Sequence, residues 1–423
     1  MSEDFLQYLW KHKKFRIRGL QTLSGKSIEV LSAGTHNHHS GPDFFNAKVR
    51  IAEQLWAGNI ELHLKSSDWY SHHHQTDPNY DNVVLHVVWE YDAAVFRSNS
   101  STIETLELRR FVDPRMLHNY HQLFANKQSW IPCERDIDSV NDFSIQHWLE
   151  KLYIERLAQR SEVIGVLLKD SNNHWESVLF KLLAKSFGLK VNGEALLRLA
   201  NSFDLSVLRK VAGNVTQLEA LLLGQAGLLE TQLEEAYLLR LQREYGFLQK
   251  KFRLTKASVV PKFGRLRPAN FPTVRLAQLA ALYHQRTHLF SELMKAEKVS
   301  DFYQFFKVTA SSYWDTHYTF GVVSRKRRKQ LSDSFIDLLL INSVIPLKFC
   351  YAQSKSKDIN ESLLDLMMRL PKEKNSVVQK FETIGLQVEH ALHSQALLQL
   401  KGSYCDLKKC LQCDVGNHLL NRN

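Results

Sequence analysis

The amino-acid sequence predicts an α+β protein, in which a smaller N-terminal domain rich in short strands precedes a larger all-α helical domain. Apolar and polar residues alternate in short runs over residues 1–115, which is typical of strands. From about residue 140, the apolar residues recur at helical spacing instead. This change of period places the two predicted domains at 1–115 and 140–423, with a linker at 116–139.

The N-terminal domain opens with a short predicted helix at residues 3–12. Alternating runs follow, separated by Gly, Asn, Asp and Ser, which are typical of turns between strands. They are KFRIRGL, SIEVLSAG, NAKVRIA, WAGNIELHLK, NVVLHVVWEYD and TIETLELRRFV. The run containing VVLHVVWEY is almost continuously apolar, which indicates a strand buried on both faces of a sheet.

The C-terminal domain is predicted to be helical. In SIQHWLEKLYIERLAQRSEVIGVLLK, the apolar residues gather on one side of a helix and the charges on the other. Further helices are predicted at 175–187, 194–222, 228–250, 273–296, 300–308, 330–345, 360–370, 375–386 and 389–400. Gly, Pro or Asn marks most of the breaks, and no fixed-period repeat indicates a solenoid.

The composition narrows the class of protein. With 44% hydrophobic and 23% charged residues among 423, the chain is typical of soluble globular proteins. The opening MSEDFLQYLW lacks the basic-then-apolar order of an export signal, and the most apolar run, 335–347, is too short to cross a membrane. Five cysteines fit a reducing compartment better than a disulfide framework. We therefore expect a cytoplasmic protein with no membrane partner.

The sequence also lacks a Walker loop, a dinucleotide glycine fingerprint and a serine elbow.

The net charge of +11 is unevenly distributed. The first 130 residues hold 14 basic and 14 acidic residues and 11 of the 19 histidines, whereas the rest hold 41 basic and 30 acidic residues. A histidine-rich front and a basic back predict that chemistry and polyanion binding are divided between the two domains. The alternative is a basic excess that serves no polyanion partner.

The stretch GNIELHLKSSDW places Glu61, His63 and Lys65 on one face of a predicted strand, because side chains alternate along a strand. Asp43 opens the preceding strand, after the turn SGP. If these strands pair as a hairpin, Asp43 and Glu61 converge, and two partly buried carboxylates repel each other unless a cation lies between them. Mg²⁺ or Mn²⁺ suits such oxygen ligands, and His63 or Lys65 would position or deprotonate an attacking water. The alternative is the polar face of an exposed strand.

This arrangement resembles the PD-(D/E)XK nuclease superfamily, since Pro42-Asp43 is followed, after a gap of seventeen residues, by Glu61-x-His63. The resemblance covers about the first 110 residues and implies an α/β domain with a mixed sheet and an αβββαβ core. It also implies cleavage of DNA or RNA with a divalent metal held by Asp43 and Glu61. His63 departs from the pattern, because it occupies the place of the family's lysine, and Lys65 on the same face is the substitute. Glu3, in the leading helix, matches a further acidic residue of the family.

A second set of ligand-type residues follows in WYSHHHQTDPNYDNVVLH. His72 and His74 share a face if this segment is extended, and Asp77 or His86 completes three ligands with an open position for water. This predicts, as an alternative, a zinc-dependent hydrolase of a small molecule with Glu61 as general base. The segment is equally compatible with a solvated loop.

Cys405, Cys410 and Cys413 form a C-x4-C-x2-C motif near the C-terminus. The Cys-x2-Cys spacing lets one turn of chain present two thiolates to a metal. A fourth ligand is needed, and the candidates are Cys133, Cys350 and His418. Zinc or an iron–sulfur cluster would each serve, and some nucleases of the superfamily above carry such a cluster as a staple between distant parts of the chain. The alternative is a set of thiols without a metal.

Two basic segments are candidates for nucleic-acid contacts, SRKRRKQ and GRLRPANFPTVR. The candidate residues are Arg325, Lys326, Arg327 and Arg328 in the first segment and Arg265 and Arg267 in the second. Aromatic residues, Tyr313, Trp314 and Tyr318, lie close to the first segment in sequence, and cations beside aromatic rings suit a phosphate backbone and unstacked bases. The alternative is a solvated helix start with its aromatics in the core, and arginines that pair with acidic helices.

Over its whole length the chain is similar to an uncharacterised bacterial family known only as a domain of unknown function. The resemblance rests on SGPDFFNAKVRI, WAGNIELHLKSSDWYSHH, YDNVVLHVV, RLRPANFPTVRLAQLA and YCDLKKCLQC, and it implies no activity. We therefore expect a metal-dependent nuclease or a nuclease-like nucleic-acid-binding protein. The alternatives are the zinc hydrolase and a nucleic-acid-binding protein that has lost catalysis.

Overall fold

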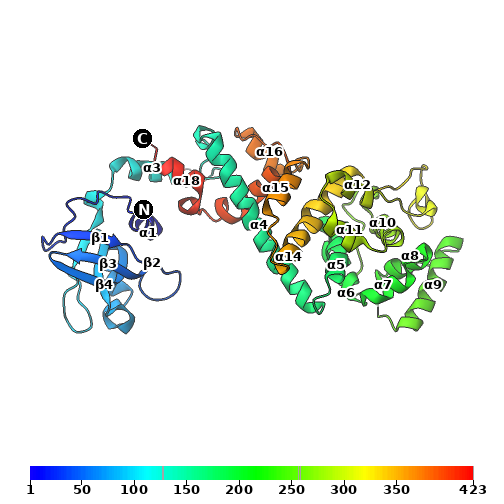
Figure 1. Cartoon of the computed structure of the whole chain (residues 1–423), viewed down its shortest axis with the longest axis horizontal. Helices are drawn as coiled ribbons and strands as arrows, with labels where there is room; N and C mark the ends of the chain where they lie inside the picture. The colour runs from blue at the N-terminus through cyan, green and yellow to red at the C-terminus, as the bar shows by residue number, and fades with distance from the viewer. Residues whose placement is uncertain (126–127, 256, 258, 423) are drawn as a thin grey trace. The chain divides into compact units, whose positions relative to one another are not determined.

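The computed structural model describes residues 1–125, 128–255, 257 and 259–422 and shows a mixed α+β protein (Figure 1). The chain divides into two compact units. The front unit comprises Met1–Trp148, Thr383–Leu386 and Leu400–Asn423, and the helical unit comprises Leu149–Glu382 and Gln387–Gln399. The segment from residue 400 onward thus belongs with the N-terminal sheet, whereas the sequence analysis grouped it with the helices.

A mixed sheet forms the centre of the front unit (Figure 1). Its strands are β1 (Ile28–Ser32), β2 (Thr35–His36), β3 (Phe44–Ile51), β4 (Gln54–Lys65), β5 (Val83–Glu90) and β6 (Thr105–Glu107). They lie in the order β1-β3-β4-β5-β6, with β2 paired to β3. The pairs β1–β3 and β3–β4 are antiparallel, whereas β4–β5 and β5–β6 are parallel. Strand β4 therefore joins the antiparallel half of the sheet to the parallel half.

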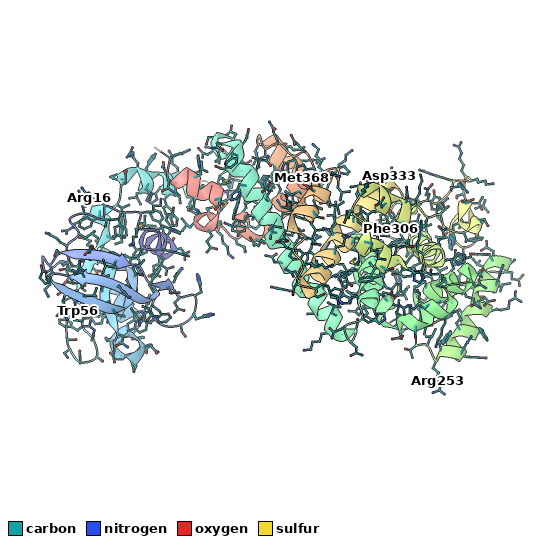
Figure 2. The ribbon with its side chains drawn as sticks, in the orientation of Figure 1. Arg16, Trp56, Arg253, Phe306, Asp333 and Met368 are labelled. Atoms are coloured by element: carbon teal, nitrogen blue, oxygen red, sulfur yellow. The ribbon has the colours of Figure 1, made fainter. Side chains whose placement is uncertain are left out.

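Strand β4 changes character along its length. Its first residues are exposed, with Leu55 at 57% and Trp56 at 39%. Figure 2 marks the position of Trp56 in the front unit. The later residues Ile60–His63 are buried, including the acidic Glu61 and the imidazole of His63. Polar side chains at such central positions of a sheet are costly unless they are paired or bind a ligand.

The run KFRIRGL, predicted as a strand, is irregular in the structure. Phe15 and Leu20 are buried, but Ile17 is 49% exposed, so the run has no continuous apolar face to lay on the sheet. Phe15 instead stacks on Trp10 of the first helix. The strand prediction was wrong here because the alternation is too short to decide the backbone conformation.

Helix α1 (Glu3–Lys11) packs its apolar face on the sheet and contacts β4. Its buried residues are Phe5, Leu6, Tyr8, Leu9 and Trp10. Full burial of each large side chain contributes roughly 1.5–3 kcal/mol, and the Trp10 indole also donates to the Ala33 carbonyl (3.0 Å). The less buried side of α1 carries Glu3 and Gln7, one turn apart.

The remaining helices of the front unit include α2 (Asp68–Ser71), which follows β4, and α3 (Pro114–Ala125), which follows β6. α18 (Asp414–Leu420) packs against α3 (Figure 1). Helix α3 therefore occupies part of the segment predicted as a linker. The long helix α4 (Asp142–Asp170) begins in this unit and continues into the helical unit.

The helical unit holds α5 (Trp175–Phe187), α6 (Leu189–Asn201), α7 (Leu205–Val211), α8 (Val215–Gln225), α9 (Ala236–Phe252), α10 (Pro272–Gln285), α11 (Leu289–Lys295), α12 (Val299–Phe306), α13 (Asp333–Leu339), α14 (Ile345–Ser354), α15 (Asn360–Met368), α16 (Ser376–Thr383) and α17 (Ala391–Gln399), with a small hairpin of β7 (His317–Thr319) and β8 (Val322–Val323). The single helix predicted at 194–222 is divided into α6, α7 and α8. Asp204 and Asn214 cap the new N-termini by accepting backbone N–H groups, which accounts for both interruptions.

The stretch Asp333–Ser354 is long and apolar enough to cross a membrane by length and composition, and 83% of its most apolar window is buried within the protein. Inside it, a π-helical segment, Leu340–Val344, precedes Pro346 near the start of α14. Proline cannot donate the helical hydrogen bond, and local π geometry is one way in which a helix accommodates it. Such burial is typical of a core helix.

Candidate metal and active site

Asp43 and Glu61 meet at one end of the β3–β4 hairpin. The register pairs Phe44 with Ile60, so Asp43, just before β3, lies next to Glu61. The Asp43 backbone N–H donates to Glu61 Oε2 (3.1 Å), and the Leu62 N–H donates to Asp43 Oδ2 (3.0 Å). The structure thus brings together the two acidic residues that the sequence analysis selected.

Helix α1 supplies two more polar groups to this cluster. Gln7 Nε2 donates to Asp43 Oδ1 (2.7 Å), which fixes the orientation of the carboxyl group. Glu3 is half-buried, and burial, with a smaller addition from the charge of Glu3, raises the pKa of both Asp43 and Glu61. Sequence reasoning placed Glu3 near the site but missed Gln7. The available signal was the four-residue spacing of Glu3 and Gln7, which places both on one helix face.

His63 lies beside Glu61 and is oriented by a second histidine. Its Nε2 is 3.5 Å from Glu61 Oε1 and 3.1 Å from Nδ1 of His72. Its Nδ1 is 2.8 Å from Nε2 of His86, which is fully buried in β5. His86 therefore holds the His63 ring with Nε2 toward the acidic cluster, as carboxylates or carbonyls hold the rings of metal-binding histidines.

The segment after α2 turns His72 and His74 toward the same point. His73 has a left-handed backbone (φ 60°), so the chain turns sharply between them. His74 Nε2 is 3.3 Å from Glu61 Oε1, is buried and has no hydrogen-bond partner in the described structure, while its ring stacks on Tyr80. The ligating atoms of His63, His72 and His74 all lie within 4.8 Å of one another.

Burial drives the titration of this cluster. It raises the pKa of Asp43 to about 7, with the charge of Glu61 adding to the shift. It raises the pKa of Glu61 to about 8, against the lowering effect of the Asp43 N–H. It lowers the pKa of His63 to about 2 and of His86 to about 3, with neighbouring imidazoles adding to both shifts. Each group therefore favours its neutral form.

The cluster lacks the basic partners that usually neutralise buried carboxyl groups. Within the described parts of the chain, the ion-pair contacts of Glu61 are with His63 and His74, and no lysine or arginine pairs with Asp43 or Glu61. A divalent cation would supply the missing positive charge. Imidazole nitrogen together with carboxylate oxygen suits Mn²⁺ or Zn²⁺ better than Mg²⁺, which prefers oxygen ligands alone. The donor set therefore fits a bound metal.

Other predicted residues lie outside this cluster. Lys65 is exposed at the end of β4, and its charge acts on the carboxyl group of Asp92. Asp77 caps a short 3-10 turn by accepting the N–H of Asn79 (2.9 Å). The residues of the two metal sites considered from the sequence thus lie in one cluster, since Glu61 contacts Asp43 and His74, and His72 contacts His63.

The predicted basic residues are exposed in the helical unit. Arg325, Lys326, Arg327 and Arg328 lie in an irregular segment between β8 and α13, and Arg265 and Arg267 lie before α10. The basic run is therefore not a helix start. Lys329 anchors it by donating to the carbonyls of Asp315 (3.2 Å) and Arg327 (3.0 Å). The nearby Trp314 is fully buried and donates to Glu219, so it is a core residue.

Four of the five cysteines gather in the front unit. Cys133, Cys405, Cys410 and Cys413 line one small cavity, whereas Cys350 is buried in α14 of the helical unit. The residues lining that cavity do not include His418. Of the fourth ligands considered from the sequence, the structure places Cys133 beside the motif.

The family model described as "Protein of unknown function (DUF2851)" matches residues 3–376. This range includes the carboxylate–histidine cluster and Cys133, while the C-x4-C-x2-C motif lies beyond it. No curated protein and no solved structure matches the chain.

Proposed function

The chain belongs to the DUF2851 family, and from that premise we propose that it is a metal-dependent phosphodiesterase that cleaves nucleic acid. One observation carries the proposal: Asp43, Glu61 and three histidines meet at one end of the β3–β4 hairpin, with no described lysine or arginine to neutralise them. A divalent cation bound by these residues would activate water as a nucleophile and offset negative charge on a phosphate.

The topology of the front unit supports the likeness to PD-(D/E)XK nucleases. Helix α1 leads, β1, β3 and β4 form an antiparallel run, and β5 returns parallel to β4 after α2. In that superfamily, the two acidic ligands stand on adjacent strands. Asp43 at the start of β3 and Glu61 in β4 have that relation.

Each side chain of the cluster has a separate task in this proposal. Asp43 and Glu61 hold the metal, together with His74 and His72. Gln7 keeps the Asp43 carboxyl group in one orientation, since it donates to the oxygen that does not accept the Leu62 N–H. His63, in the place of the family's lysine, positions the attacking water with the Nε2 that His86 leaves directed at Glu61.

Binding of the polyanion is assigned to the helical unit. Arg325, Lys326, Arg327 and Arg328 are exposed, and the exposed Arg265 and Arg267 add to the basic surface of this unit. Changing Arg325, Arg327 and Arg328 to Gln should lower the salt slope of nucleic-acid binding by about 3, because each lost phosphate contact contributes roughly 0.9. Fluorescence anisotropy at several salt concentrations measures the slope, and an unchanged slope would remove this segment from the interface.

Cleavage of labelled single- and double-stranded DNA and RNA tests the catalytic proposal. Protein stripped with a chelator receives Mg²⁺, Mn²⁺ or Zn²⁺, and cleavage is expected with Mn²⁺ or Zn²⁺. Asp43→Asn combined with Glu61→Gln should abolish it, whereas Lys65→Ala, which changes an exposed cation on the same strand, should leave it intact. Equal cleavage by the double variant and the wild type would exclude the site.

A zinc-dependent hydrolase of a small molecule is the second candidate, because three imidazole nitrogens within 4.8 Å of one another are a common zinc environment. The two candidates differ in substrate. Turnover of small esters or phosphodiesters with zinc, without cleavage or salt-dependent binding of nucleic acid, would favour the second. Salt-dependent binding without metal-stimulated turnover would instead indicate a nucleic-acid-binding protein that has lost catalysis.

A further inference from the structure

We propose that Cys133, Cys405, Cys410 and Cys413 bind an iron–sulfur cluster through four thiolates, and that this centre ties the C-terminal segment to the front unit. The proposal is independent of the reaction at the carboxylate–histidine cluster. The four ligands are distant in sequence, since Cys133 lies 272 residues before Cys405.

The four sulfurs gather around one small cavity. Cys133 comes from the turn after Ile131, and the other three come from the segment between α17 and α18. The remaining wall of the cavity is formed largely by apolar side chains, those of Pro132, Ile137, Leu400 and Val415. All four cysteines are free. Four free cysteines around one cavity form a ligand set typical of a structural metal centre.

The Cys413 sulfur has the surroundings of a metal-bound thiolate. Burial raises the pKa of the Cys413 thiol, and the nearby backbone N–H groups of Gly416 and Val415 and the indole of Trp148 counteract this rise. Several N–H donors directed at one sulfur stabilise negative charge there, and such hydrogen bonds tune iron–sulfur centres. A neutral thiol is only a weak acceptor and gains little from them.

Gly416 shows how closely the chain is folded around this group. A Cβ atom at this position would lie 2.0 Å from the backbone oxygen of Cys410, which no side chain could tolerate. The absence of a side chain therefore lets α18 approach the Cys410 turn and brings Cys413 beside Cys410. This close approach serves the spacing of the sulfurs.

The cavity between the cysteines favours a cluster over a single ion. Around one zinc ion, bonds of about 2.3 Å in a tetrahedron place the sulfurs roughly 3.8 Å apart, which leaves no cavity between them. The four cysteines instead line a cavity. A cluster of several iron and sulfide ions fills such a space.

The centre would hold a segment that supports the active-site helix. Asn421, just after α18, donates to the hydroxyl of Tyr8 in α1 (3.3 Å), and Tyr8 is next to Gln7. Arg422 donates to Asp136 (2.7 Å), three residues after Cys133. Loss of the centre should therefore release residues 400–422 and loosen α1.

Metal and sulfide analysis of the full-length protein purified without oxygen tests the proposal. We expect between about two and four iron per chain, an equal amount of sulfide and a brown colour, because four cysteines bind either a two-iron or a four-iron cluster. Cys133→Ser and Cys413→Ser should each lose most of the iron, whereas Cys350→Ser, which changes a buried cysteine of the helical unit, should keep it. Asp43→Asn with Glu61→Gln should also keep it, which separates this centre from the proposed active site.

Because a ligand variant can fail to fold, a second measurement uses the wild-type chain. Removal of iron by a chelator should make residues 400–422 several-fold more sensitive to limited proteolysis, and reconstitution with iron and sulfide should restore protection. One zinc per chain, lost in the same two variants, would support the four-thiolate site and overturn the cluster. No metal before or after reconstitution, or disulfides among the four cysteines in mass spectra, would overturn the proposal.

Discussion

The buried Lys348 ammonium of the helical unit donates to three carbonyls, whereas the half-buried Asp43 and the buried Glu61 of the front unit lie beside each other, with the imidazoles of His63 and His74 next to Glu61. Lys348 Nζ lies 2.8–3.0 Å from the carbonyl oxygens of Leu293, Met294 and Ala296, at the end of α11. In the front unit, burial and like charges raise the pKa of both carboxyl groups.

A half-buried arginine of the helical unit is held by hydrogen bonds in a similar way. Arg160 donates to the Ile341 carbonyl (2.7 Å), to Asn342 (2.8 Å) and to Gln395 (3.0 Å). A buried charge whose hydrogen bonds are all made stabilises one packing arrangement, whereas buried like groups without a counter-charge store an unfavourable interaction that a ligand can relieve. This difference indicates that Lys348 and Arg160 stabilise the fold, whereas the carboxylate–histidine cluster is the candidate for ligand binding.

The largest effect is expected from Asp43→Asn combined with Glu61→Gln. Metal affinity should fall by at least about 1,000-fold, since two ligands are lost and even outer-shell partners contribute 10–100-fold. The metal-free protein should become more stable, by roughly 1 kcal/mol, because the buried repulsion is removed. Isothermal titration with Mn²⁺ and thermal unfolding at pH 8 measure the two quantities. A double variant that is less stable than the wild type without metal would show that the cluster is structural.

Lys348→Met should be the next largest change and should act on stability alone. Loss of the ammonium leaves three buried carbonyls without a donor, which should lower the free energy of unfolding by about 3 kcal/mol. Urea unfolding followed by far-UV circular dichroism measures the change. Mn²⁺ affinity should stay as in the wild type, and an altered affinity would contradict the separation of the two clusters.

The pH dependence of metal binding sharpens the comparison further. Below the raised pKa values of about 7 for Asp43 and about 8 for Glu61, a metal must displace their protons. Burial lowers the pKa of the proposed ligand His74, which reduces the number of protons that its ring releases on metal binding. Affinity should therefore rise with pH, up to about 100-fold per unit below pH 7, and level off above pH 8. Titrations between pH 5.5 and 9 test this, and a flat profile would contradict the raised pKa values.

The same shifts set the stability of the metal-free front unit. A carboxyl group whose pKa is raised on folding loses stability as pH rises from its unfolded value, about 4, to its folded value. The lowered pKa of His63 and His86 removes stability as pH falls below about 6.5. Without metal, this unit should thus be most stable between about pH 4 and pH 6.5, where the two effects offset each other. Saturating Mn²⁺ should remove the decline above pH 7, as thermal unfolding across the pH range would show.

The smallest effect is expected from His86→Gln, which keeps a polar group beside His63 but not the imidazole that orients it. Metal affinity should fall by about 10-fold, as for other outer-shell partners. The matched control is His36→Gln, which changes a histidine that stacks on Phe44 and is not a member of the three-histidine group. Equal effects of the two substitutions would remove His86 from the support of the site.

Sequence reasoning predicted the pairing of Asp43 and Glu61 because a hairpin depends on local alternation and turn residues. It could not predict that His72 and His74 join them, since their direction depends on the left-handed backbone of His73, which no residue pattern signalled. Choosing Cys133 over Cys350 as the partner of the C-terminal motif likewise required tertiary structure. The prediction of a strand at KFRIRGL was wrong because so short a pattern does not decide between strand and loop.

The return of residues 400–422 to the front unit has a consequence for biosynthesis. This segment leaves the ribosome only after the entire helical unit has been made, so the support behind α1 is missing while the sheet and its acidic residues are already outside the ribosome. A nascent chain would therefore carry an incomplete front unit while the helical unit is being made, and the front unit could be completed only after α18 has emerged.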